Sequence, residues 1–182
     1  MSESSPIKDA LYAKIDGIGQ EQIHQLLLNN KFSELIERIY EPVIHSVQDI
    51  DEYEKHGTLA ESLTHYLFTE MLIPSQRKIT FENIELDMII PNTTELQKNS
   101  QNIIIIFFVK TSNIAEIKQK IQDLKKLQKD DTKIWIISNE HIKIPQSTYI
   151  TEKESFGKFL KDAQNFIETK KMNKLNIFKT KV

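Results

Sequence analysis

Two short apolar segments, each carrying a charge, constrain the fold of this chain more than any other feature. Residues 84–90 read IELDMII, and residues 103–112 read IIIIFFVKTS. Short runs rich in β-branched residues and bounded by polar residues are typical of buried strands. Asp87 lies in the middle of the first run and Lys110 near the end of the second. Because an unpaired charge is costly to bury, we expect these side chains to pair, to bind a metal ion or to line a cleft.

The residues around these two runs predict an α/β fold. Apolar spacing predicts a helix from Thr58 to Met71, with Thr58 and Glu61 forming a capping box at its start. The polar stretch 91–102 is expected to be a loop. The other predicted elements are, in order, strands over 78–82, 84–90 and 103–109, a helix over 114–127, strands over 133–138 and 147–150, and a last amphipathic helix. This order indicates an α/β sandwich with a mixed central sheet.

The first 50 residues predict a small helical region. Pro6 is placed to open a helix, and Gly17 and Gly19 interrupt the pattern before the next one. A further helix is expected to end or kink at Pro42. We therefore divide the chain into a helical region over 1–50, an α/β domain over 58–169 and a basic tail over 170–182.

Composition limits the classes of function. The 182 residues suit one domain with a small appendage, and the net charge of -2 gives no overall basic field, so any contact with nucleic acid must come from a local patch. The absence of cysteine excludes disulfides and thiolate chemistry. The longest apolar run is too short to span a membrane, and no secretory signal precedes it. We expect a cytoplasmic protein with no membrane partner.

The order of elements and the positions of the charges resemble the PD-(D/E)xK, or restriction-endonuclease-like, nuclease superfamily, which includes Holliday-junction resolvases. The resemblance covers about residues 58–138. In that family a helix supplies a Glu, a hairpin strand supplies an Asp, and the next strand supplies (Asp/Glu)-x-Lys. The matching residues here are Glu61, Asp87 and the Phe-Val-Lys of 108–110. The resemblance implies an αβββαβ core preceded by the helical region.

The resemblance also implies roles for these residues. Hydrolysis of a phosphodiester needs Mg²⁺ to polarise the phosphate and to activate water, and Mg²⁺ prefers oxygen ligands. Asp87 would be the principal metal ligand and the carbonyl of Val109 a second one. Lys110 would position or deprotonate the attacking water, and Glu61 would be an auxiliary acid.

One position departs from the family pattern. The acidic residue expected two positions before Lys110 is Phe108, whose ring cannot bind Mg²⁺. Glu85, two residues before Asp87, is the first candidate for a substitute carboxylate, and Glu116 is the second. The motif is therefore degenerate, and the site is predicted to be weak or inactive.

Simpler interpretations exist for the same residues. Asp87 and Lys110 are also consistent with a plain salt bridge at the edge of the sheet. The capping box with Thr58 is enough to explain Glu61. Glu61 and His65 are four residues apart and therefore share one helix face. They could form the edge of a site or an ordinary pair on the surface.

A second resemblance lies near the N-terminus. Residues 15–27 read IDGIGQEQIHQLL and are similar to a helix-hairpin-helix DNA-binding element, in which Gly17, Ile18 and Gly19 would form the turn. Such a turn presents free N–H groups that hold a phosphate of the DNA backbone. Glu21 stands where a basic residue is usual. The alternative is an ordinary turn between two helices with a glycine cap.

These observations lead to one preferred function and two alternatives. The preferred function is a nucleic-acid-associated, nuclease-like protein whose phosphodiesterase site is degenerate. The alternatives are an active Mg²⁺-dependent DNA endonuclease and a non-catalytic interaction or scaffold module. DNA, including branched DNA, is the expected partner, Mg²⁺ is the expected cofactor of an active site, and a homodimer is left open.

Overall fold

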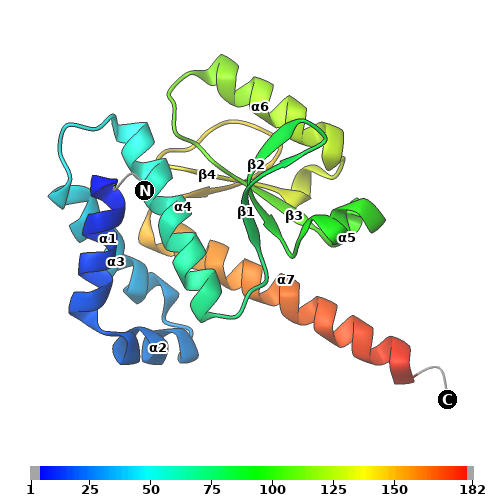
Figure 1. Cartoon of the computed structure of the whole chain (residues 1–182), viewed down its shortest axis with the longest axis horizontal. Coiled ribbons are helices and arrows are strands. Elements are labelled where there is room, and N and C mark those ends of the chain that lie inside the picture. The colour runs from blue at the N-terminus through cyan, green and yellow to red at the C-terminus, as the bar shows by residue number, and fades with distance from the viewer. Residues whose placement is uncertain (1–4, 180–182) are drawn as a thin grey trace.

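The computed structural model of the chain describes residues 5–179, and of residues 172–179 the backbone alone. In this part of the chain, helices pack on both faces of one five-stranded sheet (Figure 1). The strands are β1 (Gln76–Phe81), β2 (Ile84–Ile90), β3 (Ile104–Phe108), β4 (Ile134–Ser138) and β5 (Ser147–Ile150). The helices are α1 (Pro6–Ile18), α2 (Gln20–Leu28), α3 (Phe32–Ser46), α4 (Glu52–Glu70), α5 (Thr93–Lys98), α6 (Ile114–Leu127) and α7 (Lys153–Lys179), with short 3₁₀ turns at Ser100–Asn102 and Asp131–Lys133.

The sheet is mixed, as the sequence predicts. Strand β2 runs antiparallel to both of its neighbours, β1 and β3, whereas β3, β4 and β5 are parallel. Their order across the sheet is the same as their order along the chain. The strands that carry Asp87 and lead to Lys110 are therefore interior strands, and the alternative that placed these residues at a sheet edge does not match this order.

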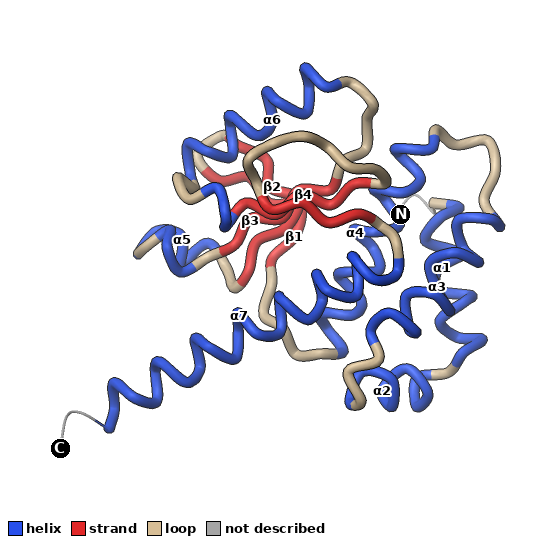
Figure 2. The backbone as a smooth tube through the Cα atoms, turned by 180° about the vertical axis from the view of Figure 1, so that it is seen from behind, coloured by secondary structure: helices blue, strands red, loops and turns tan. Residues whose placement is uncertain are grey.

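Both faces of the sheet are covered, which explains its nearly continuous apolar strands. Met88, Ile104 and Ile106 belong to a core cluster with α4 and α7, whereas Ile103 and Ile105 pack with α6. Figure 2 shows the sheet between α6 on one side and α7 on the other, with α1, α2 and α3 beside α4.

The N-terminal helices share the core of the sheet. Leu11 of α1, Ile23 of α2 and Leu35 of α3 lie in the same buried cluster as α4, α7 and the strands. Helix α3 also contacts α7 closely, because a Cβ atom added at Gly157 would lie 3.0 Å from the backbone nitrogen of Ser33. The predicted helical region 1–50 is thus packed as part of one body with the α/β region.

The start of α4 differs from the prediction. Asp51 caps the helix by accepting hydrogen bonds from the backbone N–H groups of Tyr53 and Glu54. Thr58 and Glu61 therefore lie inside the helix, and the predicted capping box is wrong. The first turns of α4 are polar because several of their side chains face solvent, and this polarity, together with Gly57, is typical of a loop in the sequence.

Other boundaries differ as well. Pro42 does not end α3, which continues to Ser46, because Tyr40 and Val43 stay buried on its inner face. The stretch 91–102 contains α5, whose cap Asn92 accepts a hydrogen bond from the N–H of Glu95. The predicted basic tail is a continuation of α7 as far as Lys179, and its residues 180–182 lie outside the described residues. No helix in the described part of the chain is long and apolar enough to cross a membrane.

Candidate functional site

Helix α4 crosses the end of β3 at very short range, and Gly57 permits this approach. A Cβ atom added at Gly57 would lie 2.3 Å from the carbonyl oxygen of Val109 and 2.6 Å from Cγ of Lys110. Any larger residue would force the helix away from the strand. Glu61 follows Gly57 by four residues on the same helix face and is thereby carried over Lys110.

Glu61 is buried between two positive charges. Only 3% of this residue is exposed. Its Oε2 accepts a hydrogen bond from Nζ of Lys110 at 2.5 Å, and its Oε1 lies 3.9 Å from Nη2 of Arg77, an ion-pair distance with no hydrogen bond. A carboxylate this deeply buried is held by its partners, and here both partners are cations that keep partial contact with solvent.

Asp87 lies next to this ion pair. Its Oδ2 accepts a hydrogen bond from the backbone N–H of Phe108 at 2.9 Å. Burial raises the pKa of Asp87, the hydrogen bond from Phe108 and the charge of Lys110 lower it, and the charge of Glu61 raises it. The charges of Lys110 and Glu61 therefore both act on the carboxyl group of Asp87.

The strand is irregular at Asp87. Leu86 and Ile89 pack on the α6 side of the sheet, whereas Met88 packs on the α4 side, so the alternation of faces shifts at this residue. On β1, Lys78 lies between the residues that pair with Met88 and Leu86, and its φ of 50° is unusual for any residue other than glycine. The regular pairing of β1 with β2 is thus interrupted at Asp87.

The structure thus brings together the three predicted residues Glu61, Asp87 and Lys110, but with a different pairing. Lys110 pairs with Glu61, and the described contacts of Asp87 include no direct salt bridge to Lys110. The simpler interpretation, a plain salt bridge between Asp87 and Lys110, does not match these contacts.

Arg77 and His65 also belong to the site. Arg77 had no signal in the sequence, because it reaches Glu61 only through the register of the β1–β2 hairpin. The sequence had indicated His65 through its spacing from Glu61. Burial and the charge of Arg77 lower the pKa of His65. The Nδ1 atom of His65 is buried and has no hydrogen-bond partner in the described residues.

The two predicted substitute carboxylates do not join the site. Glu85 is exposed beside α6, where its carbonyl accepts a hydrogen bond from Lys120. Glu116 accepts a hydrogen bond from Asn113 at the start of α6. The side chain of Phe108 is buried in the core on the α4 side, where the family pattern has an acid.

As they are arranged, these residues do not fit a Mg²⁺ site. Magnesium needs several oxygen ligands in a near-octahedral arrangement. One oxygen of Asp87 is occupied by an N–H group, Glu61 is paired with Lys110, and the carbonyl of Val109 faces the backbone of Gly57. The described residues contain no group of three or more His, Asp or Glu side chains suited to a metal ion. Binding of Mg²⁺ stays a prediction.

The two glycines of the predicted helix-hairpin-helix turn lie in different local structures. Gly17 and Ile18 lie inside α1, and only Gly19, with a φ of 89°, forms the junction to α2. The N–H of Gly19 donates to the carbonyl of Ile15, so it is not free for a phosphate. Binding of DNA at this turn stays a prediction.

Comparisons with protein-family models, with curated proteins and with solved structures gave no match for this chain.

Proposed function

We propose that this chain is a nucleic-acid-associated protein with a restriction-endonuclease-like core whose hydrolytic site is degenerate. The order α4, β1, β2, β3, α6, β4 supports this scaffold, since a helix precedes three antiparallel strands, and a helix and a parallel strand follow them. Helix α5 is an addition between β2 and β3. In this proposal, the ion pair of Glu61 and Lys110 replaces a working metal centre.

The convergence of charges on the end of β3 carries the proposal. Four different elements or their ends supply the charged residues Glu61, Arg77, Asp87 and Lys110. A core that served only stability would not need charged residues there. Charged groups that are costly to bury and lie in one place are typical of a functional site. The partly exposed cations of Arg77 and Lys110 suit contact with a backbone phosphate, which carries no sequence information.

Binding is tested by gel shift with duplex, forked and four-way-junction DNA at one stated salt concentration. We expect binding without Mg²⁺ that weakens as salt increases, and we expect Arg77→Gln to weaken it on every DNA and to reduce its salt dependence. Lys98→Gln, an exposed lysine of α5, is the matched control for loss of one positive charge. No binding to any of the three DNAs would favour the interaction module and remove the nucleic-acid interpretation.

Catalysis is tested separately with Mg²⁺ and Mn²⁺. We expect no cleavage above that of Asp87→Ala. Phe108→Glu is expected to create measurable Mg²⁺ affinity in calorimetry, and Phe108→Gln, of similar size but uncharged, controls for the disturbed core. Cleavage by the wild type that Asp87→Ala and Lys110→Ala abolish would establish the alternative, an active Mg²⁺-dependent DNA endonuclease.

A homodimer stays a prediction. Sedimentation of the free protein and of its DNA complex measures whether one or two copies bind.

A further inference from the structure

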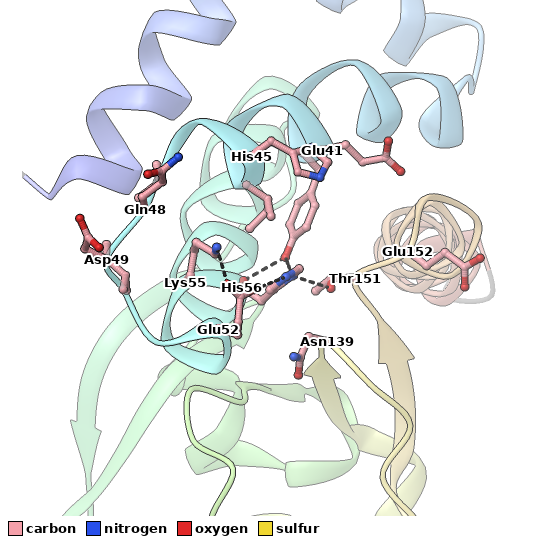
Figure 3. A pocket seen from close by; sticks show the side chains of 14 residues that line it. Glu41, His45, Gln48, Asp49, Glu52, Lys55, His56, Asn139, Thr151 and Glu152 are labelled. Carbon is pink, nitrogen blue, oxygen red and sulfur yellow. Dashed lines mark hydrogen bonds and ion pairs between the residues drawn. The ribbon is translucent and has the colours of Figure 1, made fainter.

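A large cavity lies at the start of α4, and none of Glu61, Arg77, Asp87 and Lys110 lines it. Its volume is about 810 Å³, within the range of small-molecule sites. It opens between the end of α3, the loop that follows it, the first turns of α4 and the residues after β4 and β5 (Figure 3). Ligands of open α/β sheets commonly bind beyond the carboxyl ends of parallel strands, where this cavity lies.

Fixed polar contacts form one wall of the cavity. The hydroxyl of Tyr40 lies 2.9 Å from Nδ1 of His56 and donates to the carbonyl of His56 at 3.1 Å. The same Nδ1 lies 3.3 Å from Oγ1 of Thr151. Burial lowers the pKa of His56, which favours its neutral form. This wall is therefore held in place by contacts within the protein.

Lys55 is a buried cation with unused hydrogen-bonding capacity. The residue is only 8% exposed, and its side chain extends toward the cavity (Figure 3). Its Nζ donates to Oε1 of Glu52 at 2.6 Å, which uses one of the three N–H donors of an ammonium group. No other partner of Nζ is found among the described residues. A buried donor group of this kind favours a ligand with an acceptor such as a carboxylate.

Carboxylates surround the mouth of the cavity. The exposed side chains of Glu41, Asp49, Glu52 and Glu152 line it, whereas Lys55 is the only lysine or arginine among the described residues of the lining. Such a rim repels polyanions, including DNA, and attracts cations. A fitting ligand has an acidic group for Lys55 and positive charge for the rim.

We propose that this cavity binds a free basic amino acid, with its carboxylate on Lys55 and its cationic groups among the rim carboxylates. Arginine and lysine carry one carboxylate and two positive charges, so they match both parts of the lining. This inference does not depend on the proposed nucleic-acid function.

Titration calorimetry of the full chain with arginine, and with agmatine, which lacks only the carboxylate, tests the contact with Lys55. We expect arginine to bind, and we expect the ratio of arginine to agmatine affinity to fall about tenfold in Lys55→Gln, because one charged contact is lost. An unchanged ratio, or no heat with millimolar arginine or lysine, overturns the proposal.

The rim is tested at Asp49, an exposed position. Asp49→Asn is expected to weaken arginine binding severalfold, and Asn suits the positive φ of 60° at this position. Glu54→Gln, on the same first turn of α4 as Glu52 but outside the lining, is the control and is expected to change nothing. Glutamate or inorganic phosphate binding as tightly as arginine would mean that Lys55 alone selects the ligand, and the assignment of the rim would be wrong.

Discussion

At the scale of single residues, the site at the end of β3 contains charged groups that are costly to bury. Glu61 is buried and depends on Lys110 and Arg77 for compensation. Asp87 is partly buried and has one backbone hydrogen bond. A core built for stability alone would contain apolar residues at these positions, since breaking a buried pair costs more than the pair contributes.

The dependence of Glu61 on Lys110 is measurable. Lys110→Met is expected to lower the free energy of unfolding by about 3 kcal/mol, because it leaves a buried carboxylate without its closest cation. The double variant Glu61→Gln with Lys110→Met is expected to recover a large part of this loss. Urea denaturation of the double-mutant cycle gives the coupling energy. Lys98→Met, on an exposed lysine, is the control, and equal losses in the two lysine variants would contradict the assigned burial of the pair.

Asp87 is expected to reduce stability at neutral pH. Burial raises its pKa in the folded protein, so folding favours the protonated form. The stabilisation from a raised pKa is present below the unfolded-state pKa and is lost as pH rises through the folded-state pKa. Asp87→Asn keeps an acceptor for the N–H of Phe108 and is expected to gain about 1 kcal/mol at pH 7, with the gain vanishing near pH 3. Urea midpoints at both pH values measure this, and a loss of stability at pH 7 would show that the charge of Asp87 is fully compensated.

At the scale of helices and strands, the long periodic segments were predictable from sequence and the position of α4 was not. The strand 84–90, the helix 114–127 and the mixed sheet are confirmed, because their apolar patterns are strong and local. The start of α4 was missed because its first turns are polar and contain Gly57. That glycine reflects a contact with Val109, which is distant in sequence and has no local signal.

The same distinction applies to the site. Asp87 and Lys110 were predictable because a charge within an apolar strand is conspicuous. For Glu61, the sequence left a cap and a site as alternatives, and only the true start of α4 at Asp51 excludes the cap. The contribution of Arg77 depends on hairpin register, which the sequence alone does not specify at this position.

The role of Gly57 is tested with a pair of glycine variants. Gly57→Ala is expected to destabilise the protein by more than 2 kcal/mol, since its methyl group would overlap the carbonyl of Val109 and α4 would have to move. Gly17→Ala, inside α1 with no atom within 4 Å of the new methyl group, is expected to stabilise it by about 0.5–1 kcal/mol. Thermal or urea unfolding of both variants measures the difference. Tolerance of alanine at position 57 would mean that α4 and β3 are farther apart than described here.

At the scale of the whole molecule, the N-terminal helices are attached to the α/β layers by both apolar and polar contacts. Helix α3 packs against α7, and Lys153 pairs with Glu37 across this contact. His56 joins α3, through Tyr40, to Thr151, which precedes α7. A change at His56 should therefore affect how the two parts of the molecule are held together.

Acid is expected to weaken this attachment. The pKa of His56 lies below its usual value because of burial, with Glu52 opposing and Lys55 assisting that shift. A lowered histidine pKa stabilises the folded protein above the unfolded-state pKa of about 6.5, and this stabilisation is lost as pH falls toward the folded-state pKa. Urea midpoints between pH 8 and pH 5 are expected to fall less steeply in His56→Gln than in the wild type. His141→Gln, at an exposed position, is the control, and parallel curves for His56→Gln and the wild type would remove His56 as the cause.

The order of the strands has a consequence for how the protein is made. Because neighbours in the sheet are also successive along the chain, each strand can join its predecessor as it leaves the ribosome. Helix α7 comes last, yet Phe156, Phe159 and Leu160 fill the centre of the core that α3 and α4 share with the sheet. Until translation reaches this helix, the nascent chain exposes that apolar surface and is most in need of a chaperone.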